Sequence, residues 1–496
     1  MTDPIMITTF AGARTAFRQK NLQQDQYRAG GLVMDDVLVN LHGTEHRNRR
    51  RIENRLFRRD TFELYERELF PVVIEQTLAP YLKQGRAELV YLGHQMMLNL
   101  AALTAGVDRP LGTPEETERL HEYLMVFVEA ATLEQYVGDR EAAKARILAA
   151  LDEWDAEFLA PSIRRRQALL DAVAAGRLAA EDLPRDVLTT LLRYRDELDL
   201  TDGVIRRETA FFLLAAAHTS ATAFGRAIYH ILKWCETHPE DRARVHQDQL
   251  FVQRCVHEMV RLNPSSPVAM RVATEPVTLD TGEAIPAGGR LVVDLGQVNR
   301  DQSVFGPDAA AFDPYRQVPV GVAPFGLSFG AGMHVCIGQD MAAGVVGDYD
   351  LHHLFGLVTI AVQRMFAADV RFDPDHPPVA DGKTVRPYWA QFPVLLDRPE
   401  PASAGARVAV GEPTATATES PAGTASGRVQ VVVDSDICIS TGKCVADEPT
   451  GFAFDADEIA VATDGAAGLP EARLIAAARN CPSGAITVLR GGRAVI

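Results

Sequence analysis

FGAGMHVCIG, residues 329–338, is a glycine-lined loop that places one cysteine at the start of a segment with a helical pattern. Gly330 and Gly332 can take backbone angles that are closed to other residues, so the chain can lie flat against a planar ligand. Free amides and the positive end of the helix predicted over 337–358 favour a deprotonated Cys336 sulfur. A glycine-rich turn around a buried cysteine is the alternative interpretation. An aromatic residue, a histidine and a third glycine at fixed offsets favour a haem-binding thiolate.

The composition is that of a globular protein. The chain has 496 residues, 47% of them hydrophobic, and this length predicts two or three domains. Its formal charge of −16 argues against nucleic acid and anionic membranes as partners. The N-terminus lacks the basic, apolar and small-residue pattern of a secretory signal, and the longest apolar run, 210–217, is far too short to span a bilayer. We therefore expect a soluble, cytoplasmic protein.

A change of composition divides the chain. Residues 399–428 are rich in Ala, Thr, Gly, Pro and Ser and cannot bury enough apolar surface to fold, so they are predicted to be a flexible linker. A linker of this length spans roughly 30 Å on average. It separates a large body, residues 1–398, from a small tail, residues 429–496.

The body is predicted to be mainly α with small β regions, and the tail to be α+β. Apolar residues recur at three- and four-residue spacing in the body, which predicts helices over 61–100, 114–155, 161–200, 203–236 and 241–263. Turn signals bound two short body strands, 277–279 and 291–295. The tail pattern predicts strands at 429–433, 452–454, 459–462 and 485–489 and a helix at 471–479.

A haem with a thiolate ligand carries two propionates that need cationic partners, and the body offers a set. His46 and Arg50 are one helical turn apart and therefore face the same side. Arg271 follows an extended Asn-Pro-Ser-Ser-Pro lead-in that would carry it past the haem edge, and His334 lies in the cysteine loop itself. Each taken alone is an ordinary surface residue, but together they predict an anion-binding set.

Glu258 and Arg261 are three residues apart on a predicted helix, and Arg316 lies between them and the cysteine loop. An isolated Glu-x-x-Arg pair at the surface contributes little. A buried glutamate flanked by two arginines would instead lock the segment that presents Cys336. We therefore predict a structural role for these three residues.

On these residues the body resembles a cytochrome P450, a haem-thiolate monooxygenase of the soluble bacterial type. The resemblance covers about residues 40–396 and includes the Asn299-Arg300-Asp301 segment. It implies the P450 fold, haem b with Cys336 as axial ligand, and dioxygen chemistry. One departure is that only about 45 residues precede the His46/Arg50 pair. The family has a longer segment there, which builds a small sheet and an entrance loop, so a remodelled substrate entrance is expected.

The second departure lies in the middle of the helix predicted over 203–236. The family carries a small residue, an acid and an alcohol there, whereas this chain reads AAHTS at 216–220. The resemblance implies that Thr219 is the hydroxyl on the oxygen side of the haem, and His218 stands at the position of the acid. His218 could relay protons near neutral pH, since its reference pKa is about 6.5. Substrate contact and a structural role are the alternatives for His218.

The tail carries Cys438 and Cys444 in one short loop and Cys481 much later, before a proline. Thiolates at this spacing can hold an iron–sulfur cluster. A zinc site is the rival, but the isolated third cysteine fits zinc spacing poorly. The tail resembles a small bacterial ferredoxin over its whole length, with Thr441 at the position of the usual middle cysteine. Three thiolates favour a 3Fe–4S cluster, and a 4Fe–4S cluster with Thr441 or water on the odd iron stays open.

An electron carrier tethered to a haem oxygenase makes electron delivery intramolecular. The sequence therefore predicts a monooxygenase that inserts one atom of dioxygen into a small organic substrate, by hydroxylation or oxidative demethylation. The chain shows no flavin or nicotinamide fingerprint, so a separate NAD(P)H-dependent flavoprotein ferredoxin reductase is expected as a partner. The acidic residues Asp434, Asp436, Asp447 and Glu448 around the tail loop are expected to steer a basic face of that reductase.

Two other functions stay open. One is a haem-thiolate enzyme that uses peroxide or rearranges its substrate without external electrons, which the histidine at position 218 suggests. The other is a non-catalytic haem sensor of redox state or gas. The ferredoxin-like tail disfavours both, because neither needs a repeated supply of single electrons.

Overall fold

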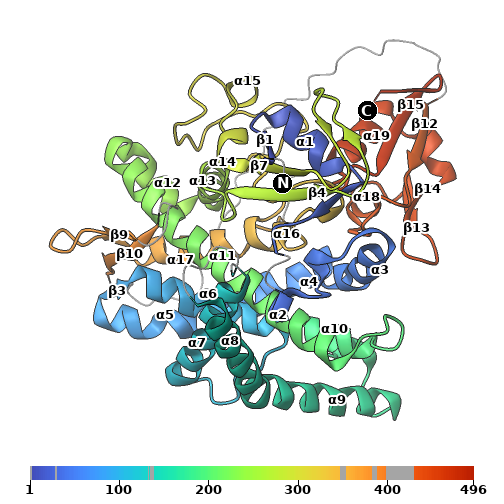
Figure 1. Ribbon diagram of the computed structural model, residues 1–496. Helices are drawn as coiled ribbons and strands as arrows, with labels where there is room; N and C mark the ends of the chain where they lie inside the picture. Colours follow the sequence, from blue (N-terminus) through green and yellow to red (C-terminus); the bar gives the residue numbers. More distant parts are fainter. Residues whose placement is uncertain are drawn as a thin grey trace.

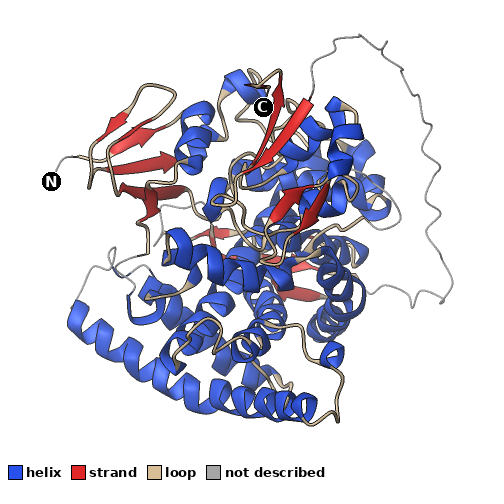
Figure 2. Cartoon of the chain, turned by 90° about the vertical axis from the view of Figure 1, so that its right-hand side faces the viewer, coloured by secondary structure: helices blue, strands red, loops and turns tan. Residues whose placement is uncertain are grey.

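The computed structural model describes residues 3–27, 31–131, 133, 139–346, 353–382, 388–397 and 429–495. Helices dominate, and the strands form small sheets (Figure 1, Figure 2). The predicted mainly helical fold with small β regions is confirmed. The linker predicted over 399–428 lies outside the described residues. Within the described ranges, no helix combines the length and apolar character needed to cross a membrane.

The body is built from helices of very different lengths, of which α11 is the longest at 36 residues. The body helices are α1 (Phe10–Arg18), α2 (Gly31–Met34), α3 (Gly43–Glu53), α4 (Arg59–Leu64), α5 (Phe70–Gln84), α6 (Leu89–Ala105), α7 (Pro114–Ala131), α8 (Arg140–Trp154), α9 (Ala160–Ala174), α10 (Val187–Arg193), α11 (Asp202–Thr237), α12 (Arg242–Gln247), α13 (Gln249–Leu262), α14 (Leu295–Val298), α15 (Gln302–Phe305), α16 (Gln339–Ala343) and α17 (Leu357–Ala367).

The body sheets are small. A four-stranded sheet runs in the order β1 (Ile5–Ile7), β7 (Arg290–Asp294), β4 (Val268–Ala273) and β2 (Leu22–Gln24), with β1 parallel to β7. A three-stranded sheet joins β3 (Arg86–Glu88), β11 (Pro393–Leu395) and β8 (Arg371–Phe372), and two-stranded pairs join β5 (Val277–Thr278) to β6 (Ala284–Ile285) and β9 (Val379–Ala380) to β10 (Trp389–Gln391). The short N-terminal segment thus supplies both edge strands of the largest body sheet.

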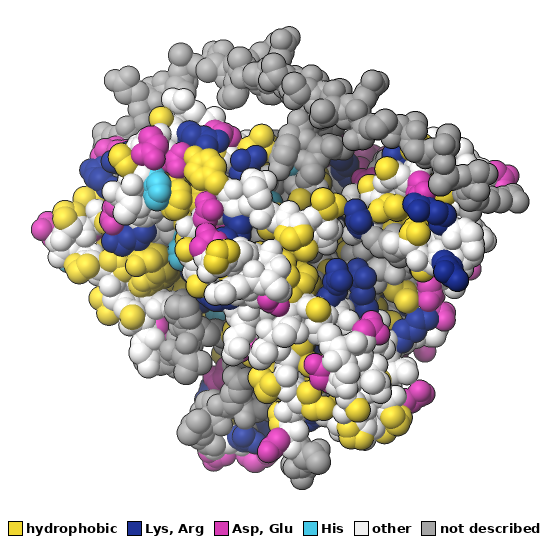
Figure 3. Space-filling model, turned by 90° about the horizontal axis from the view of Figure 1, so that it is seen from above, with side chains coloured by type: hydrophobic (Ala, Val, Ile, Leu, Met, Phe, Trp, Pro, Cys, Tyr) yellow, Lys and Arg dark blue, Asp and Glu magenta, His cyan; other side chains and the backbone are white. Residues whose placement is uncertain are grey.

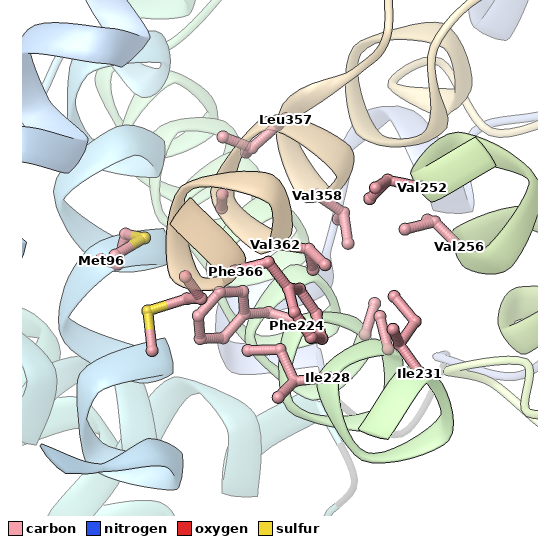
Figure 4. Packing of buried hydrophobic residues seen from close by; sticks show 14 of the residues in the cluster. Met96, Phe224, Ile228, Ile231, Val252, Val256, Leu357, Val358, Val362 and Phe366 are labelled. Carbon is pink, nitrogen blue, oxygen red and sulfur yellow. The ribbon is translucent and has the colours of Figure 1, made fainter. Parts of the chain in front are cut away.

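The core of the body forms where α11 meets α6, α13 and α17 (Figure 4). Apolar side chains from these helices interdigitate there, and each fully buried one stabilises the fold by about 1.5–3 kcal/mol. The labelled members are Met96 of α6, Phe224, Ile228 and Ile231 of α11, Val252 and Val256 of α13, and Leu357, Val358, Val362 and Phe366 of α17. This packing fixes α11, the helix that carries Thr219, relative to the rest of the body.

The helix predicted over 203–236 is confirmed by α11, but other predicted helices are divided. The segment 61–100 breaks at Gly85, which has φ +70 and ends α5, and the chain then forms β3 before α6 begins. The segment 241–263 breaks at Asp248, whose side chain caps α13. The helical spacing of apolar residues continues through both breaks. The breaks are therefore recognised only from the conformation of Gly85 and from the cap formed by Asp248.

The helix predicted over 337–358 is wrong. Helix α16 ends at Gly344 with φ +79, and α17 begins after Gly356 with φ +84. Side chains from distant parts of the sequence stabilise the end of α16 and the start of α17. The Gln253 side-chain amide donates to the Ala343 carbonyl at 3.1 Å, and Glu66 accepts from the Gly356 amide at 2.9 Å. Because glycines in the left-handed region stop a helix, the segment after Cys336 makes only a short helix before the chain leaves it.

The tail forms its own small fold, with the strands and helix close to their predicted positions. Strand β12 (Val429–Val433) pairs with β15 (Ile486–Arg490), which pairs with β16 (Arg493–Ala494), and β13 (Phe452–Phe454) pairs with β14 (Ala460–Ala462). Helices α18 (Lys443–Asp447) and α19 (Glu471–Asn480) complete it. Figure 1 shows the tail, in red, lying against the body beside α1 and α3.

The surface carries mixed charge. On the face that Figure 3 shows, the described Lys and Arg side chains lie interspersed with Asp and Glu. The formal charge of −16 is therefore not gathered into a single patch on that face.

Candidate functional site

Cys336 lies in a loop whose shape depends on glycine. Gly330 and Gly332 both have φ +73, a conformation that favours glycine. The Cys336 amide donates to the Phe329 carbonyl at 2.8 Å and closes the loop. The Cys336 side chain keeps exposed surface, yet burial among protein atoms raises the pKa of its thiol, and the Gly338 amide lowers it. The Cys336 sulfur is therefore surrounded by protein atoms but remains accessible. The Gly338 amide stabilises its deprotonated form.

Three of the predicted propionate-binding residues meet beside this loop. The rings of His46 and His334 lie 4.3 Å apart between centroids, and Arg50 donates to the Val335 carbonyl at 2.7 Å. Each has a buried nitrogen (Nε2 in both histidines, Nε in Arg50) for which the described residues offer no hydrogen-bond partner. Burial, and then the Arg50 charge, lower the pKa of His46 to about 3. Buried donors without acceptors are costly, so this set fits an anion.

Arg271, the fourth predicted member, reaches the same place from β4. Burial is the main cause that lowers the pKa of His334, and the charge of Arg271 contributes to it. The Arg271 guanidinium lies 5.2 Å from the centroid of the Phe17 ring and donates to the Gln24 side chain. Two arginines and two histidines therefore converge beside Cys336. Together with Cys336 they supply a thiolate ligand, two cationic arginines and two imidazole donors for two carboxylates, so the residues present fit a haem.

Glu258, Arg261 and Arg316 come together as a buried triad. Arg261 forms a two-point ion pair with Glu258, with Nε–Oε2 at 2.6 Å and Nη2–Oε1 at 2.7 Å, and Arg316 Nε lies 3.0 Å from Glu258 Oε1. Arg261 also donates to the Asn299 carbonyl at 2.6 Å, and the Asn299 side chain accepts from the Leu327 amide at 2.8 Å. The triad thus links α13 to the chain that leads into the cysteine loop.

Thr219 and His218 lie in the middle of α11. The Thr219 hydroxyl donates to the Ala215 carbonyl one turn earlier at 2.6 Å. Ala217 is a buried member of a large apolar cluster against which Ile337, the residue after Cys336, also packs. His218 is partly buried, and its ring stacks on that of His94 from α6, with centroids 5.8 Å apart. His218 therefore points into the helix bundle.

Cys438, Cys444 and Cys481 line one small pocket together with Thr441. Burial raises the pKa of Cys444 to about 12, and the charges of the other two cysteines add to this, which is the effect of sulfurs that lie close together. The hydroxyl of Ser440 is buried beside them and has no hydrogen-bond partner in the described part of the chain. The arrangement fits an iron–sulfur cluster held by three thiolates.

The tail is attached to the body by ion pairs along one face of α3 and the turn that follows it. Arg55 and Arg58 both bind Glu458, at 2.9 and 2.7 Å, and Glu458 consequently has a lowered pKa despite its burial. The other contacts are Arg47 with Asp436 at 2.8 Å, Lys20 with Asp434 at 3.0 Å, Arg51 with the Asp457 carbonyl at 3.0 Å, and the Asn54 amide with the Ile439 carbonyl. Sequence reasoning missed these cations, although arginines at 47, 51, 55 and 58 follow helical spacing.

The acidic residues around the tail loop do not play one common role. Asp434 and Asp436, two of the acidic residues predicted to steer a reductase, form ion pairs with Lys20 and Arg47 of the body. Glu448 pairs inside the tail with Arg473, at 2.6 Å. In this arrangement the acidic side of the cluster loop belongs to an intramolecular interface.

A direct hydrogen bond joins the two cysteine loops. The Pro482 carbonyl, next to Cys481, accepts from the Gly332 amide at 3.2 Å, and the Gly332 carbonyl accepts from the Val335 amide at 3.1 Å. Val335 is covalently joined to Cys336. A Cβ at position 332 would lie 2.0 Å from a backbone oxygen of α1, so this close approach requires glycine. A path of two hydrogen bonds and the covalent bonds between them therefore runs from Cys481 to Cys336.

Two family models match the chain. Residues 153–344 match the model of the cytochrome P450 family, which covers Thr219, Glu258 and Cys336. Residues 431–488 match a model described as a 4Fe-4S single cluster domain, which covers all three tail cysteines. The second description names the cluster type that the sequence left as the open alternative.

Known relatives and solved structures agree with these matches. The 6-deoxyerythronolide B hydroxylase of Saccharopolyspora erythraea is 32% identical over 190 residues, which is 38% of this chain and 43% of that protein. Human cytochrome P450 4F12 is 30% identical over 183 residues, 32% of this chain and 34% of that protein. The chain thus spans less than half of the length of these relatives.

Among solved structures, the P450 heme domain of Tepidiphilus thermophilus has a TM-score of 0.60 at 17% identity and covers 79% of this chain and 88% of that chain. P450BioI, solved in complex with hexadec-9Z-enoic acid ligated acyl carrier protein, has a TM-score of 0.59 at 19% identity and covers 79% of this chain and 91% of that chain. At this identity the likeness shows the P450 fold.

Proposed function

This chain carries a cytochrome P450 domain followed by a single-cluster iron–sulfur domain, and from that premise we propose that it is a monooxygenase fed by its own tail. The reaction consumes one organic substrate, one dioxygen, two electrons and two protons. One oxygen atom enters a C–H bond of the substrate, and the other leaves as water. Where the hydroxylated carbon is a methyl group on a heteroatom, loss of formaldehyde completes a demethylation.

The haem would be held by the residues that converge beside the cysteine loop. Cys336 would bind the iron, and His46, Arg50, Arg271 and His334 would bind the two carboxylates. When bound, a haem with a thiolate ligand supplies the activation of dioxygen. Glu258, Arg261 and Arg316 would hold the backbone that presents Cys336, because their bonds tie α13 to that segment.

Helix α11 would supply the proton-handling groups. The Thr219 hydroxyl now donates to the Ala215 carbonyl, and rotation about its χ1 would free it to donate to a bound group. His218 stands next to it, in place of the acid that the family resemblance implies. The two residues would hold and pass protons at the Thr219 Oγ1 and the His218 ring.

The tail cysteines Cys438, Cys444 and Cys481 would hold the cluster. We propose 3Fe–4S, because Thr441 occupies the position between the first two thiolates where a fourth would stand. The family description favours 4Fe–4S. Electron paramagnetic resonance separates the two, since an oxidised 3Fe–4S cluster is paramagnetic and an oxidised 4Fe–4S cluster is not.

The hydrogen bond between the Pro482 carbonyl and the Gly332 amide carries the proposal of self-supply. It brings the chain beside a cluster ligand into contact with the loop of the proposed haem ligand, and the ion pairs along α3 hold that contact. A tether makes the effective concentration of the carrier about millimolar. A separate flavoprotein reductase would deliver electrons from NAD(P)H to the tail.

The test removes the cluster and leaves the haem. Cys444→Ala is expected to keep the haem-thiolate absorption and the carbon monoxide difference spectrum but to lose turnover driven by reductase and NAD(P)H. The matched control is Cys235→Ala, a half-buried cysteine of α11 outside both sites. Normal reductase-driven turnover by Cys444→Ala would contradict self-supply.

The histidine at position 218 gives one reason to test a peroxide-using enzyme. Wild-type protein is assayed in parallel with hydrogen peroxide alone and with reductase, NAD(P)H and dioxygen. Product formed only with peroxide would replace the monooxygenase proposal by the peroxide one. Product in the reductase arm, with one oxygen atom from labelled dioxygen, supports it.

A further inference from the structure

Three histidines from three helices stand in a row that ends beside Thr219. His121 belongs to α7, His94 to α6 and His218 to α11. The rings of His121 and His94 lie 5.1 Å apart between centroids, and those of His94 and His218 lie 5.8 Å apart. His94, in the middle, is only 8% exposed, and the two outer rings are partly buried. The row therefore crosses the helix layer between the surface of α7 and the middle of α11.

The two ends of the row differ in charge. The carboxylates of Glu118 and Glu122, both exposed, act on His121 and oppose the lowering of its pKa by burial. The charges that act on His94 are those of the other two histidines. His94 Nδ1 and His121 Nε2 are buried, and the described residues offer them no hydrogen-bond partner. The outer end thus meets acidic surface groups, while the middle of the row holds imidazole nitrogens ready to accept or donate.

We propose that His121, His94 and His218 form a proton relay from the surface of α7 to the Thr219 hydroxyl. The inference rests on the proposed monooxygenase function, which consumes two protons in each cycle. A neutral imidazole accepts a proton on one nitrogen and releases another from the second. One proton enters at His121 and one leaves at His218, and flips of the three rings restore the starting tautomers.

The geometry and burial suit this role. Ring separations of 5.1 and 5.8 Å are short enough for a single bridging water between neighbouring rings. Burial, and then the neighbouring histidines, lower the pKa of His94 to about 3. His94 is therefore protonated only while a proton passes through it, so the relay moves protons without leaving a positive charge in the core. His94 and His121 are in this view positioning and relay residues, one and two steps removed from the reacting atoms.

The experiment interrupts the row at two points. His94→Phe keeps a ring in the buried position but removes its nitrogens, and His121→Gln changes the half-exposed outer member with little effect on packing. The control is His230→Gln, a half-buried histidine on the same helix as His218 that bonds Asn263 at 3.1 Å. Haem content and Tm are measured for each variant, so that a misfolded protein is recognised.

The first readout is the fraction of NAD(P)H electrons that ends as hydrogen peroxide. Breaking a proton path leaves electron delivery intact, so each relay variant is expected to raise this fraction by about tenfold and to increase the solvent isotope effect. The His94/His121 double variant is expected to match the His94 single variant, because the steps act in series. Additive effects, or normal coupling in His94→Phe, would overturn the relay.

The second readout needs no turnover. In NMR spectra of the resting ferric protein with labelled histidine, His121→Gln is expected to shift the ring nitrogen signals of His94, whereas His230→Gln leaves them unchanged. If these signals are coupled but wild-type protein forms no oxygenated product, the proposed function fails and the coupling within the row of histidines stands. If product forms and His121→Gln leaves the His94 signals unchanged, the relay alone fails.

Discussion

Two faces of α3 both carry basic side chains, but the two faces have different functions. On the inward face, His46 and Arg50 are buried beside the cysteine loop, and each keeps a nitrogen without a partner among the described residues. On the outward face, Arg47 and the arginines of the following turn pair with carboxylates of the tail. A buried cation without a carboxylate is a binding site for an anionic ligand, whereas a surface cation facing carboxylates is a docking contact.

A third side of the same helix faces the body. Arg49 pairs with Glu208 of α11 at 2.7 Å, and Glu53 lies fully buried beside them. This ion pair joins α3 to α11. The helix therefore connects the proposed haem site, the tail and α11, and each side can be altered separately.

The largest expected effect belongs to the inward face. Arg50→Met removes a buried cation that would bind a haem carboxylate, and hydrogen bonds to charged groups are worth about 1.5–3 kcal/mol. We expect haem affinity to fall by at least about tenfold, measured by haem transfer to apomyoglobin. Arg51→Met is the matched control, because Arg51 is the next residue but faces Asp457 and Glu197. Equal haem loss from both variants would contradict the proposal that only the inward face of α3 binds the haem.

The outward face is tested next by reversing one charge. Glu458→Lys replaces two ion pairs with repulsion from Arg55 and Arg58, so the docked population should drop by about tenfold. Stopped-flow reduction of the haem under carbon monoxide measures the electron transfer rate, which in wild type should also fall with added salt. Glu471→Lys, which faces Arg490 within the tail, should leave the rate near normal. A normal rate in Glu458→Lys would show that docking does not use this face.

The third side predicts a pH dependence of stability. Burial raises the pKa of Glu208 to about 7, and burial together with the Glu208 charge raises the pKa of Glu53 well above its usual value near 4.5. The folded state thus binds protons more tightly than the unfolded state, so this stabilisation is present below about pH 4.5 and is lost as pH rises through about 7.

Glu53→Gln should therefore raise Tm at pH 8 and flatten the decline of Tm between pH 5 and pH 8. Glu45→Gln, at an exposed position of the same helix, should keep the wild-type slope. Identical slopes in wild type and Glu53→Gln would show that the buried carboxyl does not titrate in this range.

The smallest expected effect is at the edge of the docking interface. Lys20 pairs with Asp434 at 3.0 Å, but both side chains are more than 40% exposed. Exposed pairs contribute about 0.2–1 kcal/mol, so Lys20→Gln should slow electron transfer by less than about fivefold. A slowing as large as that of Glu458→Lys would make the α1 end, rather than the α3 turn, the main contact.

Much of the site could be predicted from sequence because its residues lie in local patterns. The spacing within 329–338 gave the thiolate loop, helical spacing paired His46 with Arg50, and the cysteine spacing of the tail indicated a cluster. The long helix α11 followed from periodicity alone. Such features depend on neighbours within one or two turns, which a sequence window contains.

Contacts between distant segments escaped prediction. The end of α16 depends on Gln253, 90 residues earlier in the chain, and the start of α17 depends on Glu66, 290 residues earlier. The row of histidines joins three helices, and only the packing of α6 between α7 and α11 aligns the rings.

The sequence by itself determined the candidate ligands, because the loop around Cys336 and the three-cysteine tail are defined by residue type and spacing. Tertiary structure decided which basic side chains beside the Cys336 loop form no ion pair and which basic side chains pair with carboxylates of the tail. The physical reason is that the role of an arginine or a glutamate depends on its burial and on the group that it contacts. Burial and contacts in turn depend on segments that meet only in the folded chain.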